Sequence, residues 1–391
     1  MKLLPFKLEG DKKIWILLIL LALISVLSVY SSTYRLTMRT GNLLVPISRH
    51  LFFLALGFIG IYIMHKKTLR YYKLFVPLVL AFVVICLILV FFIQSEGERR
   101  WLFSRSLQPS DIVKVVMVVY LAKVLSDGFG GSIKMFFWRV IFPILLVCIL
   151  VIRGHTSNAV IIAGVSMLMV FMGATNIKYR FLSILVMFVV LSGYLLFYKD
   201  IGRGETASSR ITTWISNTFY PSKTYGNGTK TTSRKSNYSQ AETAQYAIVS
   251  GGLFRIAPGK SFYRKTLSEA HNDYIFAIIV EEYGMAGGIF VIIIYLMLFY
   301  RILMVLKKCT RPFTSLLLSG LLILIISQTF IHIGVSVGGL PITGQNLPLI
   351  STGGTSIIIT CIAFGMILAT SRIAEENEQE ESQNQSKKEI V

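Results

Sequence analysis

One aspartate stands where a long polar segment turns into an apolar run. Asp273 lies in the stretch Ser-Glu-Ala-His-Asn-Asp-Tyr-Ile-Phe (268–276), just before a run of apolar residues long enough to cross a membrane. Acidic side chains are costly inside a bilayer and persist where they face a cavity or a partner. An acid at this boundary can accept a proton from a substrate hydroxyl while the lipid part of the substrate stays in the membrane. We therefore predict that Asp273 is a catalytic base, with His271 beside it in a substrate site.

A carboxylate just before a helix has a second interpretation, which is helix capping. Asn272 or Ser268 can cap the helix equally well, so capping alone does not require Asp273. Glu281 and Glu282 follow about two turns later. We expect one of them to face the interior of the bundle and to bond to a neighbouring helix in a structural role.

A second pair of charges opens another apolar run. The stretch Gln-Pro-Ser-Asp-Ile-Val-Lys (108–114) places a proline and an acid where the first turn of a helix favours them. Asp111 and Lys114 are three residues apart and share one helix face. Two interpretations stay open: the pair only neutralises itself, or Lys114 faces a cavity and contacts an anionic substrate.

A glycine- and proline-rich stretch, 338–356, joins the last two apolar runs. Its composition precludes a regular helix through most of its length. Irregular backbone at membrane depth is tolerated only where it lines protein or a water-filled cavity. The end of the stretch leaves backbone N–H groups near a helix start, which favours anions, so a phosphate cradle and a re-entrant structural loop are both compatible with it. The candidate binding residues here are Ser351, Gly353, Gly354, Thr355 and Ser356.

The short turn 153–158, Arg-Gly-His-Thr-Ser-Asn, is a further polar segment between apolar runs. His155 is interpreted as a turn residue rather than a catalyst. Ser157 and Asn158 could cap the next helix or line the same cavity.

The composition is that of a membrane protein. Of 391 residues, 54% are hydrophobic and 15% are charged, and the mean hydropathy is +0.67. Runs of roughly 18 or more apolar residues are candidate membrane spans. Ten such runs fall near 14–31, 48–65, 74–94, 110–126, 137–152, 158–174, 181–198, 273–300, 313–338 and 350–371. We predict an all-α polytopic membrane protein of about ten transmembrane helices, with one large extracytoplasmic loop between spans seven and eight.

Lysine and arginine in the short loops predict the orientation, because they gather on the cytoplasmic side. One side holds Lys2, Lys7, Lys12, Lys13, Lys66, Lys67, Arg70, Lys73, Lys178, Arg180, Arg301, Lys307, Lys308 and Arg311. The short loops of the other side hold Arg35, Arg39, Arg49, Arg99, Arg100, Arg105 and Arg153. Both termini are therefore predicted to be cytoplasmic and the loop 199–272 external, since long loops cross largely regardless of charge.

The net charge is +20, and eleven lysines and arginines lie in the loop 199–272. A basic outer surface fits an anionic lipid-linked substrate or anionic headgroups, and nucleic acid is excluded on that side. The four cysteines form no pattern typical of a disulfide or a zinc site; they are Cys86, Cys148, Cys309 and Cys361.

The chain divides into a cytoplasmic N-terminus (1–13), one membrane domain (14–372) and a Glu/Gln/Ser/Lys-rich cytoplasmic tail (373–391) that is predicted to be disordered. Within the large loop, 222–240 is polar and predicted to be mobile. The pattern of 241–256 predicts an amphipathic helix, ended by Gly-Gly, that lies on or dips into the outer leaflet.

These segments, in this order, resemble the SEDS family, the FtsW and RodA proteins of bacterial cell-wall synthesis. The resemblance covers roughly 14–371, and four segments carry it: Arg99-Arg-Trp101, Gln108-Pro-Ser110 with Lys114, Glu269-Ala-His-Asn-Asp-Tyr-Ile-Phe276 with Glu281-Glu-Tyr-Gly284, and Pro348-Leu-Ile-Ser-Thr-Gly-Gly-Thr-Ser356. The alanine between Glu269 and His271 looks more like FtsW, because RodA tends to have Arg or Gln there.

The resemblance implies a peptidoglycan glycosyltransferase of the cytoplasmic membrane that polymerises lipid II into glycan strands at its outer face. It also implies a class B penicillin-binding protein as partner and, for an FtsW-like member, other divisome proteins and septal synthesis. The family's essential aspartate maps onto Asp273. The alternatives are the RodA-type elongation polymerase, a lipid II flippase and a scaffold; a flippase would be supported by inverted repeats, and none is found.

Glycosyl transfer from lipid II needs cationic support for the departing pyrophosphate. Lys114, Arg99 and Arg100 are the candidates, with Arg210 a weaker one. A divalent cation such as Mg²⁺ or Mn²⁺ could assist, although no ligand cluster demands it. The sequence departs from the family pattern in the turn 153–158, which lacks the usual acid, at Asp111, where Glu is usual, and at Thr352, where an aromatic is common.

Overall fold

The computed structural model describes residues 9–33, 41–42, 44–93, 108–129, 132–152, 154–174, 176–196, 214–215, 235–256, 258–267 and 270–389. This part of the chain is helical and contains no β-strand. Its long helices are α1 Lys12–Ser32, α3 Leu44–Lys66, α4 Leu69–Ile93, α5 Pro109–Asp127, α8 Thr156–Gly173, α9 Ile177–Leu196, α11 Lys235–Gly251, α12 Ile275–Lys307, α13 Pro312–Ser336 and α14 Gly354–Glu389. Between α5 and α8, the elements α6 Ile133–Phe136, η1 Phe137–Ile141 and α7 Phe142–Ile152 form one helical run with a π-turn.

The all-α membrane fold predicted from the sequence is confirmed, because each predicted span coincides with a helix or helical run. In the described part of the chain, 8 helices are long and apolar enough to cross a membrane. α5 is not among them, since it carries Asp111, Lys114, Lys123 and Asp127. The exact number of ten crossings and the place of the large loop stay predictions.

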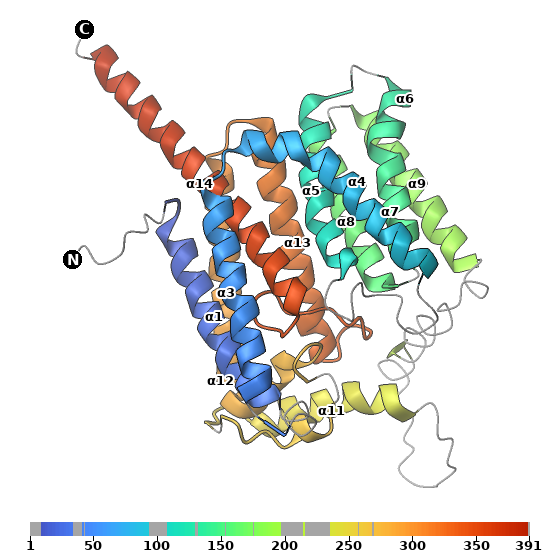
Figure 1. Ribbon diagram of the computed structural model, residues 1–391, viewed down its shortest axis with the longest axis vertical. Helices are drawn as coiled ribbons and strands as arrows, with labels where there is room; N and C mark the ends of the chain where they lie inside the picture. The colour runs from blue at the N-terminus through green and yellow to red at the C-terminus, as the bar shows by residue number, and fades with distance from the viewer. Residues whose placement is uncertain are drawn as a thin grey trace.

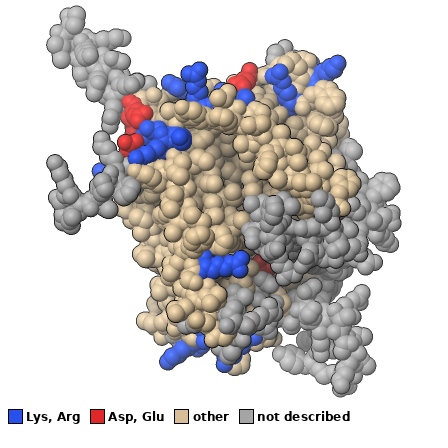
Figure 2. Space-filling model, in the orientation of Figure 1, with Lys and Arg blue, Asp and Glu red and all other residues tan. Residues whose placement is uncertain are grey.

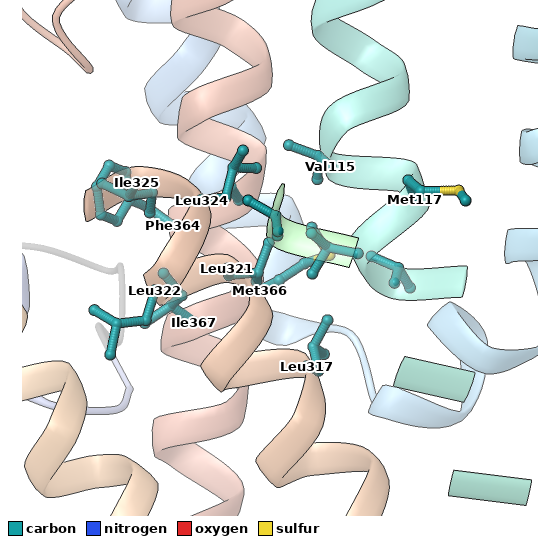
Figure 3. Packing of buried hydrophobic residues seen from close by; sticks show 14 of the residues in the cluster. Val115, Met117, Leu317, Leu321, Leu322, Leu324, Ile325, Phe364, Met366 and Ile367 are labelled. Carbon is teal, nitrogen blue, oxygen red and sulfur yellow. The ribbon is translucent and has the colours of Figure 1, made fainter. Parts of the chain in front are cut away.

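The centre of the bundle is built from α5, α13 and α14. Figure 3 shows buried apolar side chains of these three helices, among them Val115 of α5, Leu321 of α13 and Phe364 of α14. α5 is buried along nearly its whole length despite its charges. Peripheral helices instead expose large apolar residues, such as Leu74 and Leu78 of α4, as expected for a surface that faces lipid.

The helix ends define two opposite ends of the molecule. In Figure 1, α1 begins and α14 ends at one end, whereas α11 lies across the other end. On the face shown in Figure 2, most lysines and arginines lie at these two ends, with a broad band of other residues between them. At the first end Asp11 ties α1 to the bundle, because it pairs with Arg301 at 2.5 Å and its backbone N–H donates to Ser371 Oγ at 3.0 Å.

Two segments differ from expectation. α14 continues to Glu389, through the tail that was predicted to be disordered; glutamate, glutamine and lysine form helices readily and extend the preceding helix outward. α11 begins at Lys235 instead of 241, so it includes the last residues of the stretch expected to be mobile, and it ends at Gly251, beside the predicted Gly-Gly stop. Residues 222–234 lie outside the described part of the chain.

Candidate functional site

A polar cavity of about 540 Å³ lies at the end of the bundle near α11. Its walls come from the starts of α3, α5, α8 and α14, from the segment before α12, and from the segment between α13 and α14. The cavity gathers these predicted site residues: Asp111, Lys114, His271, Asp273, Gly353, Gly354, Thr355 and Ser356. These residues come from three predicted segments that are widely separated in sequence, and His155 and Asn158 of a fourth, the turn 153–158, line the same cavity.

Asp273 faces this cavity at the mouth of α12. Its side chain is half-buried, and Tyr274, not Asp273, occupies the N-cap position of the helix. A Cβ added at Gly344 would lie 3.3 Å from Asp273 Oδ2, so the glycine lets the backbone approach the carboxylate. The position agrees with a carboxylate that serves the cavity rather than the helix end.

Hydrogen bonds from the turn before α14 hold the segment that carries Asp273. Thr352 N donates to His271 O at 3.1 Å, and Thr352 Oγ1 donates to Asn272 Oδ1 at 2.8 Å. Ser351 Oγ donates to Asn272 O at 2.8 Å and accepts from Leu347 N at 2.8 Å. Ser351 is buried and does not line the cavity. Its place indicates a supporting role instead of the predicted substrate contact.

Asp111 and Lys114 form an ion pair at the cavity, so both interpretations left open by the sequence stay possible. Lys114 Nζ lies 2.8 Å from Asp111 Oδ1, and both residues line the cavity. Asn158 Oδ1 accepts from Lys114 Nζ at 3.4 Å and from Gln345 Nε2 at 2.9 Å, while Asn158 Nδ2 donates to Ser110 Oγ at 3.0 Å. The ammonium is thus largely balanced by its own helix, within a polar network that fixes this wall.

Arg49 is a cavity residue that the sequence analysis missed. It lies near the start of α3, is exposed, and has its guanidinium carbon 5.8 Å from the Phe53 ring centroid. No described carboxylate pairs with it. In the sequence, Arg49 is an arginine at the outer start of an apolar run, and it was interpreted only as a charge of a short loop.

His50, beside Arg49, fastens two walls together. Its Nε2 lies 2.8 Å from Ser25 Oγ, which donates to Ile350 O at 3.0 Å. The turn before α14 is therefore attached to α1 and α3 as well as to the segment before α12.

The glycines at the start of α14 permit close packing around the cavity. A Cβ at Gly353 would meet Asn346 Nδ2 at 2.5 Å, and one at Gly354 would meet the Phe53 ring at 3.1 Å. The N-terminal N–H groups of α14 belong to residues that line the cavity, and such groups attract anions. The arrangement is compatible with both the cradle and the structural loop that the sequence predicted.

The remaining predicted residues have other outcomes. Arg99, Arg100 and Arg210 lie outside the described residues. His155 lines the cavity at the start of α8, and Ser157 Oγ donates to Thr343 O at 2.8 Å. Among the described residues, no group of three or more His, Cys, Asp and Glu could hold a metal ion.

Both Glu281 and Glu282 are buried, although only one was expected to face inward. Glu281 Oε1 accepts from the backbone of Phe262 at 2.6 Å and Tyr263 at 3.3 Å. Glu282 accepts from Ser261 N at 3.0 Å and from the hydroxyl of Ser31 in α1. Their role in the structure is to fasten the turn 261–263 to α12 and, as predicted for one of them, to bond to a neighbouring helix.

Fold and site together define a class: a multi-pass helical membrane protein with a polar, carboxylate-bearing cavity open near one end of the bundle. Residues 11–376 match the family model FTSW_RODA_SPOVE, described as cell cycle protein, and the chain belongs to this family. The resemblance stated from the sequence motifs is confirmed.

Several curated relatives carry the FtsW name. The chain is 30% identical over 356 residues to the probable peptidoglycan glycosyltransferase FtsW of Bacillus subtilis, covering 87% of this chain and 83% of the relative. It is 29% identical to the protein of that name from Coxiella burnetii, covering 84% and 86%. Stage V sporulation protein E of Bacillus subtilis is 26% identical, covering 94% and 98%.

Solved structures show the same fold. One chain of a peptidoglycan synthase complex, solved to show how polymerization and crosslinking are coordinated, superposes with a TM-score of 0.72 at 19% identity. The match covers 94% of this chain and 99% of that one. RodA of Thermus thermophilus superposes with a TM-score of 0.65 at 21% identity, covering 94% and 98%.

Proposed function

We propose that this protein is a peptidoglycan glycosyltransferase of the FtsW type, which polymerises lipid II into glycan strands during cell division. The observation that carries the proposal is the Asp273 carboxylate, held in a polar cavity that also contains Lys114 and Arg49. The cavity volume, about 540 Å³, lies in the range of sites that enclose a small molecule or a sugar unit. The FtsW-named relatives support the same activity.

In the proposed reaction, Asp273 accepts the proton of the acceptor sugar's 4-hydroxyl as that oxygen bonds to C1 of the donor sugar. The bond from C1 to the pyrophosphate oxygen breaks, and its electron pair leaves with undecaprenyl pyrophosphate. A base within hydrogen-bond reach of the hydroxyl contributes typically 10²–10⁴-fold to such a step. The bonds from Ser351 and Thr352 would hold the base in position.

Cations and helix ends would stabilise the charge that develops on the pyrophosphate. Arg49 is the described cation best suited to this role, because no described carboxylate balances it. The N-terminus of α14 would add backbone N–H donors. Lys114 would act as part of the Asp111–Asn158 network, and Arg99, Arg100 and Arg210 stay further candidates. The described part of the chain has no cluster of His, Cys, Asp and Glu side chains that would hold a divalent cation at this step.

The proposal places the protein in the bacterial cytoplasmic membrane, with both termini cytoplasmic and the cavity open to the outside. Its partner would be a class B penicillin-binding protein that cross-links the new strands, together with other divisome proteins. One of the structural relatives comes from a peptidoglycan synthase complex, which supports a partner of this kind.

The test is a reconstituted assay with labelled lipid II, with and without a candidate transpeptidase. We expect glycan polymer from the wild-type protein and at least a 10²-fold loss for Asp273→Asn, which keeps the size of the side chain but not its basicity. The matched control is Asp127→Asn, an exposed aspartate at the far end of α5 that pairs with Lys73. Polymer from purified Asp273→Asn at the wild-type rate would rule out the role of Asp273.

The same assay separates the other functions. Transfer of lipid II between leaflets without polymer would indicate a flippase, and neither polymer nor transfer would indicate a scaffold.

A further inference from the structure

The surroundings of α12 change at Gly284. From Ile275 to Glu282 its large side chains are buried in the protein, whereas Met285, Ile289 and Phe290 are the first of a row of exposed apolar side chains. The part from 285 to 307 is roughly 34 Å long at ~1.5 Å per residue, close to the ~30 Å hydrocarbon thickness. Gly284 therefore marks the level at which lipid contact begins on the cavity side.

The segment that follows α11 is attached to α12 at this same level. Met285 N donates to Gly252 O at 2.8 Å, and Ala286 N donates to Leu253 O at 3.1 Å. Gly284 has φ +73, and a Cβ there would come within 2.7 Å of Leu253 O. The chain at 252–253 thus enters the break in α12 and runs beside its first lipid-facing residues.

The side chains of this segment are apolar and face outward. Leu253, Phe254 and Ile256 are 69%, 86% and 89% exposed. Residues 243–268 carry four lysines and arginines and no acid, among them Arg255 and Lys260 beside these apolar residues. Apolar tips flanked by cations are typical of segments that enter a leaflet and contact its phosphates.

We propose that Leu253, Phe254 and Ile256 form an anchor that inserts into the leaflet on the cavity side, with Arg255 and Lys260 at the level of the lipid phosphates. The occupant is lipid because the anchor continues the lipid-facing surface of α12, and because its charge complements anionic headgroups. The helix α11 turns Ala244 and Ala247 inward and leaves Tyr246 and Val249 exposed, so its outer apolar residues can lie in the leaflet beside the anchor. The anchor, with the turn that Glu281 fastens, sets the height of the Asp273 segment above the acyl chains.

The direct test uses the full chain in vesicles of phosphatidylglycerol and phosphatidylcholine with labelled acyl chains. A photoreactive benzoylphenylalanine replaces Phe254, with Phe290 as the lipid-facing control position and Glu378, exposed near the far end, as the water-facing one. We expect labelling of lipid from position 254 within about twofold of position 290 and at least fivefold above position 378.

Labelling from position 254 at the level of position 378 would overturn the anchor, and so would capture of a protein in place of lipid in native membranes. The same lipid labelling from position 254 is expected in a protein that also carries Asp273→Asn. The labelling therefore tests the anchor, and the lipid II polymerisation assay tests the proposed catalysis, independently of each other.

A second measurement uses trypsin, which cleaves after Arg255 and Lys260. Phe254→Ser with Ile256→Ser should expose these sites and speed cleavage in vesicles at least fivefold, whereas the apolar pair Phe254→Leu with Ile256→Val should leave the rate unchanged. Equal cleavage of all three proteins in vesicles would contradict the proposal.

Discussion

At the residue scale, the buried pair of Asp111 and Lys114 separates a structural role from a binding role. Their side chains are 8% and 5% exposed, and their charged atoms are 2.8 Å apart. Lys114→Met leaves the carboxylate buried without its partner, which typically costs about 3–5 kcal/mol. We expect a clear fall in melting temperature, measured by thermal unfolding in nanodiscs.

The double variant Asp111→Asn with Lys114→Met removes both charges and should recover most of that stability. If Lys114 also serves the substrate, the stable double variant still polymerises lipid II poorly, at least tenfold below wild type. Recovery of both stability and polymerisation would show that the pair acts only within the fold.

For Arg49 we expect a loss of activity without a loss of stability, because the side chain is exposed and has no described carboxylate partner. Arg49→Ala should lower kcat/KM for lipid II by about 10²-fold, as expected for loss of a group that stabilises developing charge, while the melting temperature stays unchanged. Arg49→Lys should recover part of the activity, and Arg70→Ala, an exposed arginine at the other end, should have no effect. Equal activity of Arg49→Ala and wild type would remove Arg49 from the site.

At the element scale, the junction of α11 and α12 depends on one glycine. Gly284→Ala places a side chain at φ +73 and within 2.7 Å of Leu253 O, which costs about 1–3 kcal/mol in strain before the clash is counted. We expect lower thermal stability and slower polymerisation. Gly164→Ala is the matched control, since a Cβ there meets nothing within 4 Å and a helical glycine is less favourable than alanine. It should be neutral or slightly stabilising, and an equal loss from both variants would contradict the role of Gly284 at this junction.

The helices and some of the charged site residues could be predicted from the sequence. Long apolar runs predicted the helices because length and hydropathy alone decide a span. Charges at the start of such runs predicted the cavity positions of Asp273 and Lys114, since charge at a membrane boundary needs a polar partner or water. The i, i+3 spacing also predicted the Asp111–Lys114 pair.

Other features depended on contacts between distant segments. Arg49 reaches the cavity only because α3 packs against α14, where Phe53 meets Gly354. Asn158 and Gln345 join the Lys114 network across long sequence separations. The break in α12 at Gly284 likewise depends on the packing of α11 against α12, because the backbone at 252–253 hydrogen-bonds to Met285 and Ala286. No local sequence pattern predicts this contact.

At the scale of the whole molecule, the two ends differ in what they hold. One end has the start of α1, the end of α14 and the ion pairs of Asp11 and Lys308 (Figure 1). The opposite end holds the cavity, α11 and the segment 252–256. The excess of lysine and arginine in the short loops predicts that the first end is cytoplasmic, so in the proposed function lipid II would reach Asp273 from outside.

Cysteine accessibility in intact cells tests this orientation. Lys260→Cys, on the cavity side, should react with a membrane-impermeant maleimide, whereas Lys67→Cys, at the other end, should react only after permeabilisation. The control is the unchanged chain, in which Cys148 and Cys361 are buried and Cys86 and Cys309 partly so. Burial also raises the pKa of Cys309 to about 11, which lowers the fraction of reactive thiolate at neutral pH. The reverse labelling pattern would place the cavity in the cytoplasm, where glycan strands are not assembled, and would contradict the proposed polymerase even if every residue in the cavity were correctly assigned.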